Sequence, residues 1–289
     1  MIPCPEREAP EAPTLAPLAV RARKQRAHRE LLTQRVLAPV GRLLVAVLIP
    51  LRVSPISIVL SNGIAGLGAA AAVVQGDLVT AAVLLQIKSV LDNVDGQLAR
   101  ATGRPSALGR YLDTEVDLVT NVALFAALGY ETGSWLLAAV ALVAATLLLS
   151  ADYNVDVLYR RTRGSDVVTE PPAAEEGRLA VALARVYRVF YGPQDQAVQR
   201  LARRRLEHVL HGVTDEDIRA GVALAYHDRL AVALLSNVGL STQLAALGVT
   251  LVLGVPTVYL WATIGALAVL PVLQLRREAL ARRTLERAA

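Results

Sequence analysis

The chain has 289 residues, of which 54% are hydrophobic but only 4% aromatic, and its formal net charge of +5 comes almost wholly from arginine. Long Ala-, Leu- and Val-rich stretches separate the arginines, which is typical of a helical membrane protein and argues against a nucleic-acid-binding protein. A single cysteine, Cys4, excludes an internal disulfide framework and a cysteine-based zinc site.

The first 53 residues are predicted to lie outside the bilayer core. Residues 1–29 are rich in proline, glutamate and, towards their end, arginine, so we expect a disordered, basic cytosolic tail rather than a signal peptide. Residues 30–53 mix leucine and valine with arginines and are interrupted by Pro39 and Pro50. We interpret this segment as an interfacial amphipathic helix. A short, unusual transmembrane helix is the alternative.

Six transmembrane helices are expected after this segment, four within residues 54–163 and two within residues 229–275. The first begins at Ser54 and is rich in glycine and alanine, which lets helices approach closely. A helix needs about 20 residues to span a bilayer. The second and third spans reach this length only if they include the acidic residues between 92 and 117.

The distribution of arginine predicts the orientation of these helices. The loops at 76–77, 131–134 and 254–255 contain no lysine or arginine, whereas the N-terminal region, the loop at 100–110, the region 160–229 and the tail at 276–289 all contain arginine. Cytoplasmic loops collect positive charge. The predicted fold is therefore an all-α integral membrane protein with six transmembrane helices, an N-terminal interfacial amphipathic helix and both termini in the cytoplasm.

Residues 164–228 form a polar region between the fourth and fifth spans. The segment 170–172 resembles a linker, two helical patterns follow, and Thr214 is a candidate cap for a further helix. Helices on the membrane surface, a small cytosolic cap and a solvated structural insertion all fit this cytosolic or interfacial helical insertion. The histidines in it are expected to be ordinary surface residues, because their spacing matches no common zinc pattern.

Four aspartates between the second and third spans are the main candidates for chemistry. Asp92 and Asp95 are three residues apart, and Asp113 and Asp117 are four apart, so on helices each pair occupies one face. Two antiparallel helices would bring all four carboxylates together. Such a cluster needs cations, and an all-oxygen site suits Mg²⁺, Mn²⁺ or Ca²⁺. Solvated helix ends, or pairing with nearby arginines, are the alternative explanation for any single aspartate.

The spacing resembles the signature of the CDP-alcohol phosphotransferase family, and every fixed position is matched: Asp92-x2-Asp95-Gly96-x2-Ala99-Arg100-x8-Gly109-x3-Asp113-x3-Asp117. The opening of the first span, Ser54 to Ser57, is similar to a Ser/Thr-Pro-Asn motif of relatives, except that Ile56 replaces the asparagine. The resemblance extends over most of residues 30–160 and 229–275 through the helix plan.

The resemblance implies a transferase that moves the phosphoalcohol part of a CDP-alcohol to an acceptor hydroxyl and releases CMP. It implies two Mg²⁺ or Mn²⁺ ions held by Asp92, Asp95 and Asp113, with Asp117 completing the metal site and serving as the catalytic general base. The implied nucleotide- and diphosphate-binding residues are Ser57, Gly96, Ala99, Arg100 and Gly109.

The identity of the alcohols is less well defined by the sequence. A phosphorylated acceptor would need a basic pocket, for which the candidates are Arg160, Arg161, Arg163 and Arg229. Three functions stay open: phospholipid biosynthesis, the same chemistry with a soluble polyol phosphodiester product, and a cation transporter that uses the aspartates. The expected partners are the donor, the acceptor and membrane lipids, with no nucleic acid, and a homodimer would fit the family. The expected location is a bacterial or archaeal cell membrane with the active site facing the cytoplasm.

Overall fold

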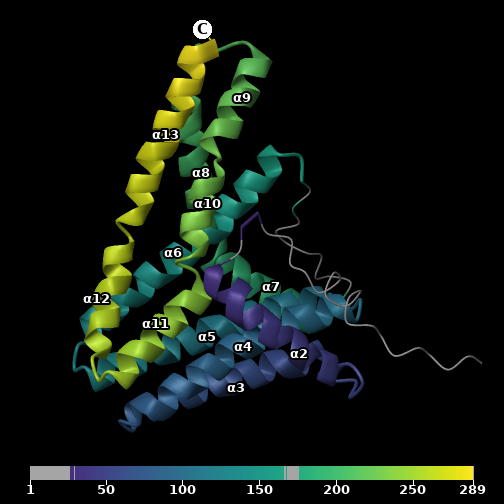
Figure 1. The fold of residues 1–289 in the computed structure, drawn as a ribbon, viewed down its shortest axis with the longest axis vertical. Helices are drawn as coiled ribbons and strands as arrows, with labels where there is room; N and C mark the ends of the chain where they lie inside the picture. Colours follow the sequence, from purple (N-terminus) through teal and green to yellow (C-terminus); the bar gives the residue numbers. More distant parts are fainter. Residues whose placement is uncertain (1–26, 29, 166, 168–175, 289) are drawn as a thin grey trace, which may run out of the picture.

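A computed structural model describes residues 27–28, 30–165, 167 and 176–288, and this part of the chain is helical with no strand (Figure 1). The predicted all-α class is therefore confirmed. The predicted disordered tail at 1–29 lies almost wholly outside the described residues, as does the predicted linker at 170–172.

The predicted interfacial segment forms two consecutive short helices, η1 (Thr33–Leu37) and α2 (Ala38–Leu48). Pro39 is tolerated because it stands in the first turn of α2, where a backbone N–H has no partner within the helix. Val45 is buried against Val94 and Leu98 of a later helix, while Leu43 and Val47 point outward. The segment thus has one buried face and one exposed face, and the interfacial amphipathic helix remains a prediction.

Three long helices pack side by side at one end of the molecule: α3 (Pro55–Val74), α4 (Leu78–Ala101) and α5 (Ala107–Glu131). Each begins at a side chain that accepts a backbone N–H. Ser54 accepts from Ile56, Asp77 from Thr80, and Ser106 from Gly109. These caps satisfy amides that would otherwise lack partners at the helix starts.

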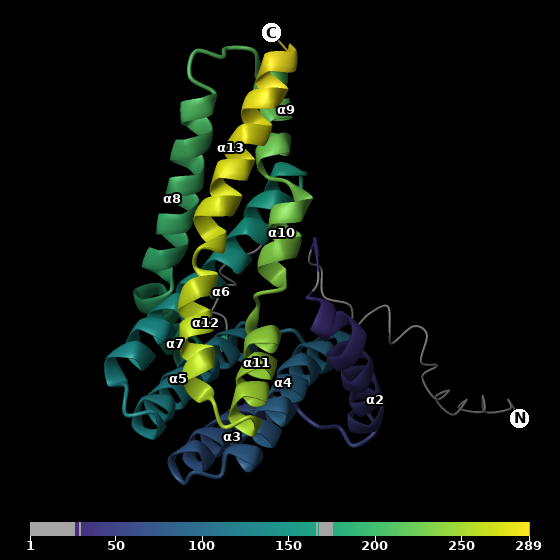
Figure 2. The same cartoon turned by 60° about the vertical axis from the view of Figure 1, so that its left-hand side comes forward.

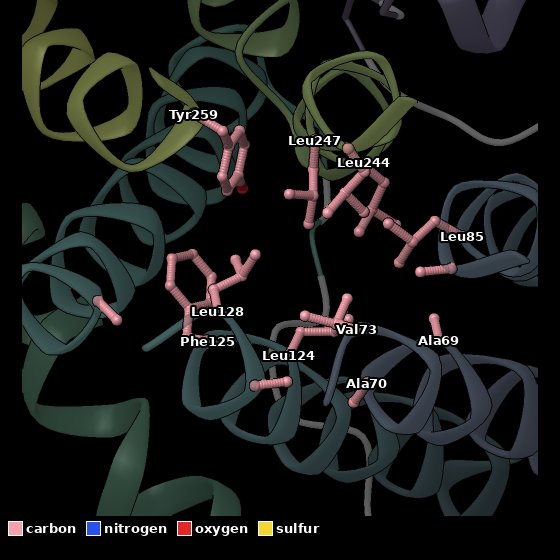
Figure 3. Packing of buried hydrophobic residues seen from close by; sticks show 14 of the residues in the cluster. Ala69, Ala70, Val73, Leu85, Leu124, Phe125, Leu128, Leu244, Leu247 and Tyr259 are labelled. Atoms are coloured by element: carbon pink, nitrogen blue, oxygen red, sulfur yellow. The ribbon is translucent and has the colours of Figure 1, made fainter. Parts of the chain in front are cut away.

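The largest apolar core joins these helices to the later ones. Leu85 of α4 and Leu124 and Leu128 of α5 face Leu247 and Tyr259 from the C-terminal part of the chain (Figure 3). All five side chains are buried. Alanines of α3, such as Ala69, complete the core and permit the close approach that its composition predicted.

The fourth predicted span and the polar insertion form four helices: α6 (Trp135–Thr162), α7 (Arg178–Phe190), α8 (Gly192–Val209) and α9 (Glu216–Tyr226). The side chain that caps α9 is Asp215, whose carboxylate accepts from the backbone N–H groups of Asp217 and Ile218. The expectation that Thr214 caps this helix is therefore wrong, because the helix starts one residue later and Asp215 takes the capping position.

The fifth and sixth predicted spans are both broken into pairs of helices: α10 (Arg229–Ser236), α11 (Leu240–Val252), α12 (Pro256–Ala266) and α13 (Val269–Ala288). Polar groups stabilise the break between α10 and α11. Asn237 Oδ1 accepts from the Leu31 backbone N–H at 3.0 Å, and the carboxylate of Glu30 accepts from the Thr242 N–H. These polar residues thus join the break to the segment that precedes α2.

At the opposite end of the molecule, α8 and α9 pack along α13, which continues well past the predicted sixth span (Figures 1 and 2). Their shared core contains Ala202, Val222, Tyr226 and Ala281. Residues 276–288 of the expected basic cytosolic tail therefore form part of a helix that packs against the insertion.

Four helical stretches are long and apolar enough to cross a membrane: Pro55–Val74, Trp135–Thr162, Glu216–Val252 and Pro256–Ala288. The last two each combine adjoining helices, so their length exceeds that of a simple span. The helices α4 and α5 are long enough, at 24 and 25 residues, but they carry the acidic residues. By length and composition, these four stretches fit an integral membrane protein, and they accompany an acidic helix pair.

Candidate active site

The aspartates lie on two neighbouring antiparallel helices, as their spacing predicted. Helix α4 continues through Asp92 and Asp95 to Ala101, and α5 starts only six residues later, at Ala107. The short loop between them contains Gly103 in the left-handed region, with a φ of 67°, which permits the sharp turn. The two acidic faces therefore meet within one helical hairpin.

Three of the four carboxylates gather closely. One oxygen each from Asp92, Asp113 and Asp117 lies within 4.8 Å of the others, and all three residues are half-buried. Asp95 lies outside this group: it is buried, and its Oδ1 accepts the backbone N–H of Gly96. Its assignment as a metal ligand stays a prediction.

A buried lysine meets the cluster. Lys88 lies one helical turn before Asp92 on α4, is fully buried, and places Nζ 2.6 Å from Oδ1 of Asp117. Three carboxylates beside one ammonium still leave a net negative charge. Since like charges held close repel one another, the group is suited to binding further positive charge.

The three clustered carboxylates fit a divalent cation. They offer only oxygen ligands, which Mg²⁺, Mn²⁺ and Ca²⁺ prefer, and their separation lets one small ion contact more than one of them. The identity and number of the ions are not defined by this geometry.

Each glycine of the motif lies close to a side chain a few residues away along the chain. A Cβ added at Gly96 would lie 3.1 Å from a guanidinium nitrogen of Arg100, so the arginine folds back over the glycine within α4. A Cβ at Gly109 would lie 3.0 Å from Oγ of Ser106, which caps α5. Their roles in nucleotide binding, like those of Ala99 and the exposed Ser57, remain predictions.

The insertion packs directly against the acidic helix α5. Glu176 accepts the backbone N–H groups of Ala107 and Leu108 at 2.6 and 2.7 Å, which adds a negative charge at the start of α5, where the helix dipole favours it. Tyr187 of α7 meets the ring of Tyr111 edge-on at a centroid distance of 5.8 Å. The insertion therefore forms part of the surroundings of the acidic helices.

Tyr191, between α7 and α8, brings the insertion to the carboxylates. Burial, followed by the negative charges of Asp117 and Glu115, raises the pKa of the Tyr191 phenol. The ring stacks on Tyr187 at 5.5 Å, and the same residue lines an apolar pocket with Leu118 and Gln243. A neutral phenol from the insertion thus lines this pocket and is influenced by the charge of Asp117.

The arginines predicted to bind an acceptor make separate contacts. Arg160 pairs with Asp156 at 3.0 Å. Arg163 lies over the ring of Tyr159 and donates to the carbonyl of His227. Arg161 and Arg229 are exposed near the ends of α6 and α10. Their role in acceptor binding remains a prediction.

Sequence reasoning missed Lys88, Glu115, Tyr191 and Asn62, all of which lie in or near this region. The position of Lys88 four residues before Asp92 was a usable signal, because that spacing places both on one helix face. Tyr191 had no such signal, since only the folding of the insertion brings it to α5.

The two acidic helices lie within a region that is similar to known proteins. Residues 43–186 match the family model described as CDP-alcohol phosphatidyltransferase. The chain is 33% identical over 136 residues to a phosphatidylinositol phosphate synthase of Corynebacterium glutamicum, covering 45% of this chain and 58% of that protein. It is 44% identical over 52 residues to a bifunctional IPC transferase and DIPP synthase of Thermococcus kodakarensis, covering 18% of this chain and 12% of that protein.

The chain therefore spans less than two thirds of either relative, and no solved structure matches it significantly. The matched region nevertheless contains α3, the whole acidic hairpin and α6. With its aspartate motif and its hairpin of facing carboxylates, the chain belongs to the CDP-alcohol phosphatidyltransferase family.

Proposed function

We propose that this protein is a membrane-embedded transferase that moves a phosphoalcohol group, in the first instance phosphatidyl, from a CDP-alcohol to an acceptor hydroxyl. The observation that carries the proposal is the meeting of Asp92, Asp113 and Asp117 within 4.8 Å on the two helices that bear the family motif. Phospholipid biosynthesis is the corresponding cellular role.

The reaction breaks the phosphoanhydride bond of the CDP-alcohol and forms a phosphodiester bond to the acceptor. The acceptor oxygen attacks the phosphorus that bears the donor alcohol, the bond from this phosphorus to the oxygen of CMP breaks, and CMP leaves. Asp117 is the proposed base that receives the proton of the acceptor hydroxyl, which requires the carboxylate to reach that proton. Lys88 holds one oxygen of this carboxylate in place through its 2.6 Å contact.

Asp92, Asp113 and Asp117, joined by Asp95 on the family pattern, would hold the divalent ions, for which we propose two Mg²⁺ or Mn²⁺. When bound, the ions would offset negative charge on the diphosphate and on the departing CMP. Gly96 and Arg100 adjoin the cluster along α4, where a diphosphate would pair with the guanidinium. Ala99, Gly109 and Ser57 are the further proposed nucleotide contacts.

The relatives suggest which acceptor to test first. One is a phosphatidylinositol phosphate synthase, and we propose a phosphorylated polyol such as inositol phosphate as the acceptor, with Arg160, Arg161, Arg163 and Arg229 as its candidate contacts. The other relative is a bifunctional IPC transferase and DIPP synthase, which keeps a soluble phosphodiester product as the second candidate.

We also propose six membrane crossings, with α4 and α5 as the second and third, an interfacial η1–α2 segment, and both termini in the cytoplasm of a bacterial or archaeal cell. The absence of arginine from the loops at 76–77, 131–134 and 254–255 supports this orientation. A homodimer is the proposed assembly. Labelling of single cysteines introduced at Arg104 and Glu131, in a Cys4→Ser background, from either side of intact vesicles tests the orientation.

The function is tested by incubating the purified full chain with Mg²⁺, a labelled CDP-alcohol and a panel of acceptors, while CMP is measured. CDP-diacylglycerol with inositol phosphate is expected to release CMP and to form a lipid product. CDP-inositol with inositol phosphate tests the soluble product. If no donor and acceptor pair releases CMP, the transferase assignment is wrong.

A further inference from the structure

Asn62 is a fully buried asparagine within the apolar helix α3, and neither its side-chain oxygen nor its nitrogen has a hydrogen-bond partner among the described residues. Burying an amide without hydrogen bonds destabilises a protein, so such a residue in a tightly packed helix calls for an explanation. Two other buried amides do have partners: Nδ2 of Asn154 donates to Asp195 at 2.6 Å, and Gln243 donates to the Val238 carbonyl at 2.9 Å. In buried Gln97 the side-chain oxygen also lacks a partner, whereas in Asn62 both polar atoms do.

The packing of α3 on α4 places Asn62 at the level of Asp92. One turn before Asn62, Ile58 shares a core with Val94. One turn after it, a Cβ added at Gly66 would lie 3.3 Å from Cδ of Lys88. Residues spaced by four lie on one face of a helix. Asn62 therefore faces α4 between the levels of Lys88 and Val94, where Asp92 stands.

The packing of α3 on α5 places Asn62 between Asp113 and Asp117. A Cβ added at Gly63 would lie 2.8 Å from Cγ1 of Val116, and one added at Gly66 would lie 2.8 Å from Cγ2 of Thr120. Asn62 precedes Gly63, so its level on α5 is that of the turn bearing the two aspartates. The unsatisfied amide is thus directed towards the interface that holds the three clustered carboxylates.

We propose that Asn62 belongs to the ligand-binding set of this site: its amide oxygen ligates, directly or through one water molecule, the divalent ion held by Asp92 and Asp113, and its Nδ2 donates to the donor diphosphate. Amide carbonyl oxygens are ordinary ligands of hard divalent cations. The metal contact requires only the acidic cluster, whereas the diphosphate contact rests on the proposed transferase function.

The proposal predicts two opposite effects when the unsatisfied amide is removed: the metal-free chain becomes more stable, and metal binding becomes weaker. Leucine has a similar size but no polar atoms, so Asn62→Leu removes the desolvation penalty and is expected to raise the melting temperature of the metal-free full chain by at least about 2 °C. The same change removes an oxygen ligand, and it is expected to weaken Mn²⁺ binding by about 10-fold or more.

The measurement uses the full chain in detergent, with Mn²⁺ alone as the probe and its free concentration followed by electron paramagnetic resonance. A Gln243→Leu variant is the matched control. It removes a buried amide that has a partner, so it should lower the melting temperature and leave Mn²⁺ affinity unchanged. Asn62→Leu with an Mn²⁺ affinity within twofold of the wild type would overturn the proposal.

A second variant keeps the test decisive if Asn62→Leu does not fold. Asn62→Asp retains the oxygen and adds a negative charge, so it is expected to bind Mn²⁺ at least as tightly as the wild type while lowering the stability of the metal-free chain. Weaker Mn²⁺ binding by Asn62→Asp, or no Mn²⁺ binding by the wild type, contradicts the proposal. A wild-type chain that binds Mn²⁺ through Asn62 but releases no CMP would refute the proposed transferase function alone.

Discussion

The ammonium of Lys88 lies 2.6 Å from Oδ1 of Asp117, across the interface between the two acidic helices α4 and α5. Lys88 is fully buried, and the side chain of Asp117 is 19% exposed. A charge taken out of water is stabilised only if it has partners. This pair therefore ties the two halves of the candidate active site together and orients the proposed base.

Loss of this ammonium should destabilise the metal-free protein. Lys88→Met leaves the Asp117 carboxylate without its counter-ion, and removing one partner of a buried pair costs about 3–5 kcal/mol, so we expect a loss towards the lower end of that range because Asp117 is partly exposed. The free energy of unfolding is measured by chemical denaturation in detergent, with a chelator present to remove metal ions.

The double variant Lys88→Met/Asp117→Asn provides the control for this pair. It removes both charges, so it should recover most of the stability lost by the single change. Added Mn²⁺ should also reduce the difference in unfolding free energy between Lys88→Met and the wild type, because a cation can replace the missing positive charge. If Lys88→Met alone were as stable as the wild type in the presence of chelator, the ion pair would contribute nothing to stability.

Substitution of the clustered aspartates should abolish the chemistry. Asp92→Asn or Asp113→Asn replaces a carboxylate in the three-residue group by a neutral amide. We expect CMP release to fall by more than about 100-fold, beyond the 10- to 100-fold that loss of an outer-shell partner costs. Asp217→Asn, at an exposed position of α9, is the matched control and should keep full activity.

Enlarging a glycine of α3 should separate α3 from α5. A Cβ at Gly66 would lie 2.8 Å from Cγ2 of Thr120 and 3.0 Å from its Cβ, closer than real contacts allow. Gly66→Ala is therefore expected to cost about 1–3 kcal/mol through overpacking and to reduce activity by displacing the cluster.

The control for this change is Gly221→Ala in α9, where an added Cβ meets nothing within 4 Å. Alanine favours a helix over glycine by about 0.5–1 kcal/mol, so this variant should be slightly more stable than the wild type. If Gly66→Ala were as stable as the wild type, the close contact between α3 and α5 would not be needed for stability.

Removing the cap that the insertion supplies to α5 should loosen the start of that helix. Glu176→Ala deprives the amides of Ala107 and Leu108 of their acceptor, which for a helix cap costs about 0.5–2 kcal/mol. Hydrogen exchange of the peptide containing these amides should accelerate, while exchange in the middle of α5 should not. Glu216→Ala, in the first turn of α9, serves as the control because α9 is capped by Asp215.

Unchanged exchange at Ala107 and Leu108 in Glu176→Ala would mean that the insertion does not hold the start of α5. This result would remove the structural reason for the insertion to influence the acidic helices. The wild-type contact distances of 2.6 and 2.7 Å favour the opposite outcome.

Local patterns predicted the parts of the fold that depend on spacing along one helix. The aspartate spacing placed the carboxylates on facing helices, and the proline and glycine positions marked several helix starts and turns. Apolar length alone did not predict that the fifth span breaks at 237–239, because that break is stabilised by contacts from Glu30 and Leu31, about 200 residues away.

What the sequence by itself determined is the family motif and the helical hairpin that carries it, because helix periodicity is a local property. The tertiary structure alone decided that Asp92, Asp113 and Asp117 form the close group, with Asp95 outside it. It also decided that Lys88 meets Asp117 and that Asn62 is buried without partners. These relations depend on the register between α3, α4 and α5, which is set by packing at Gly63 and Gly66 rather than by any single helix.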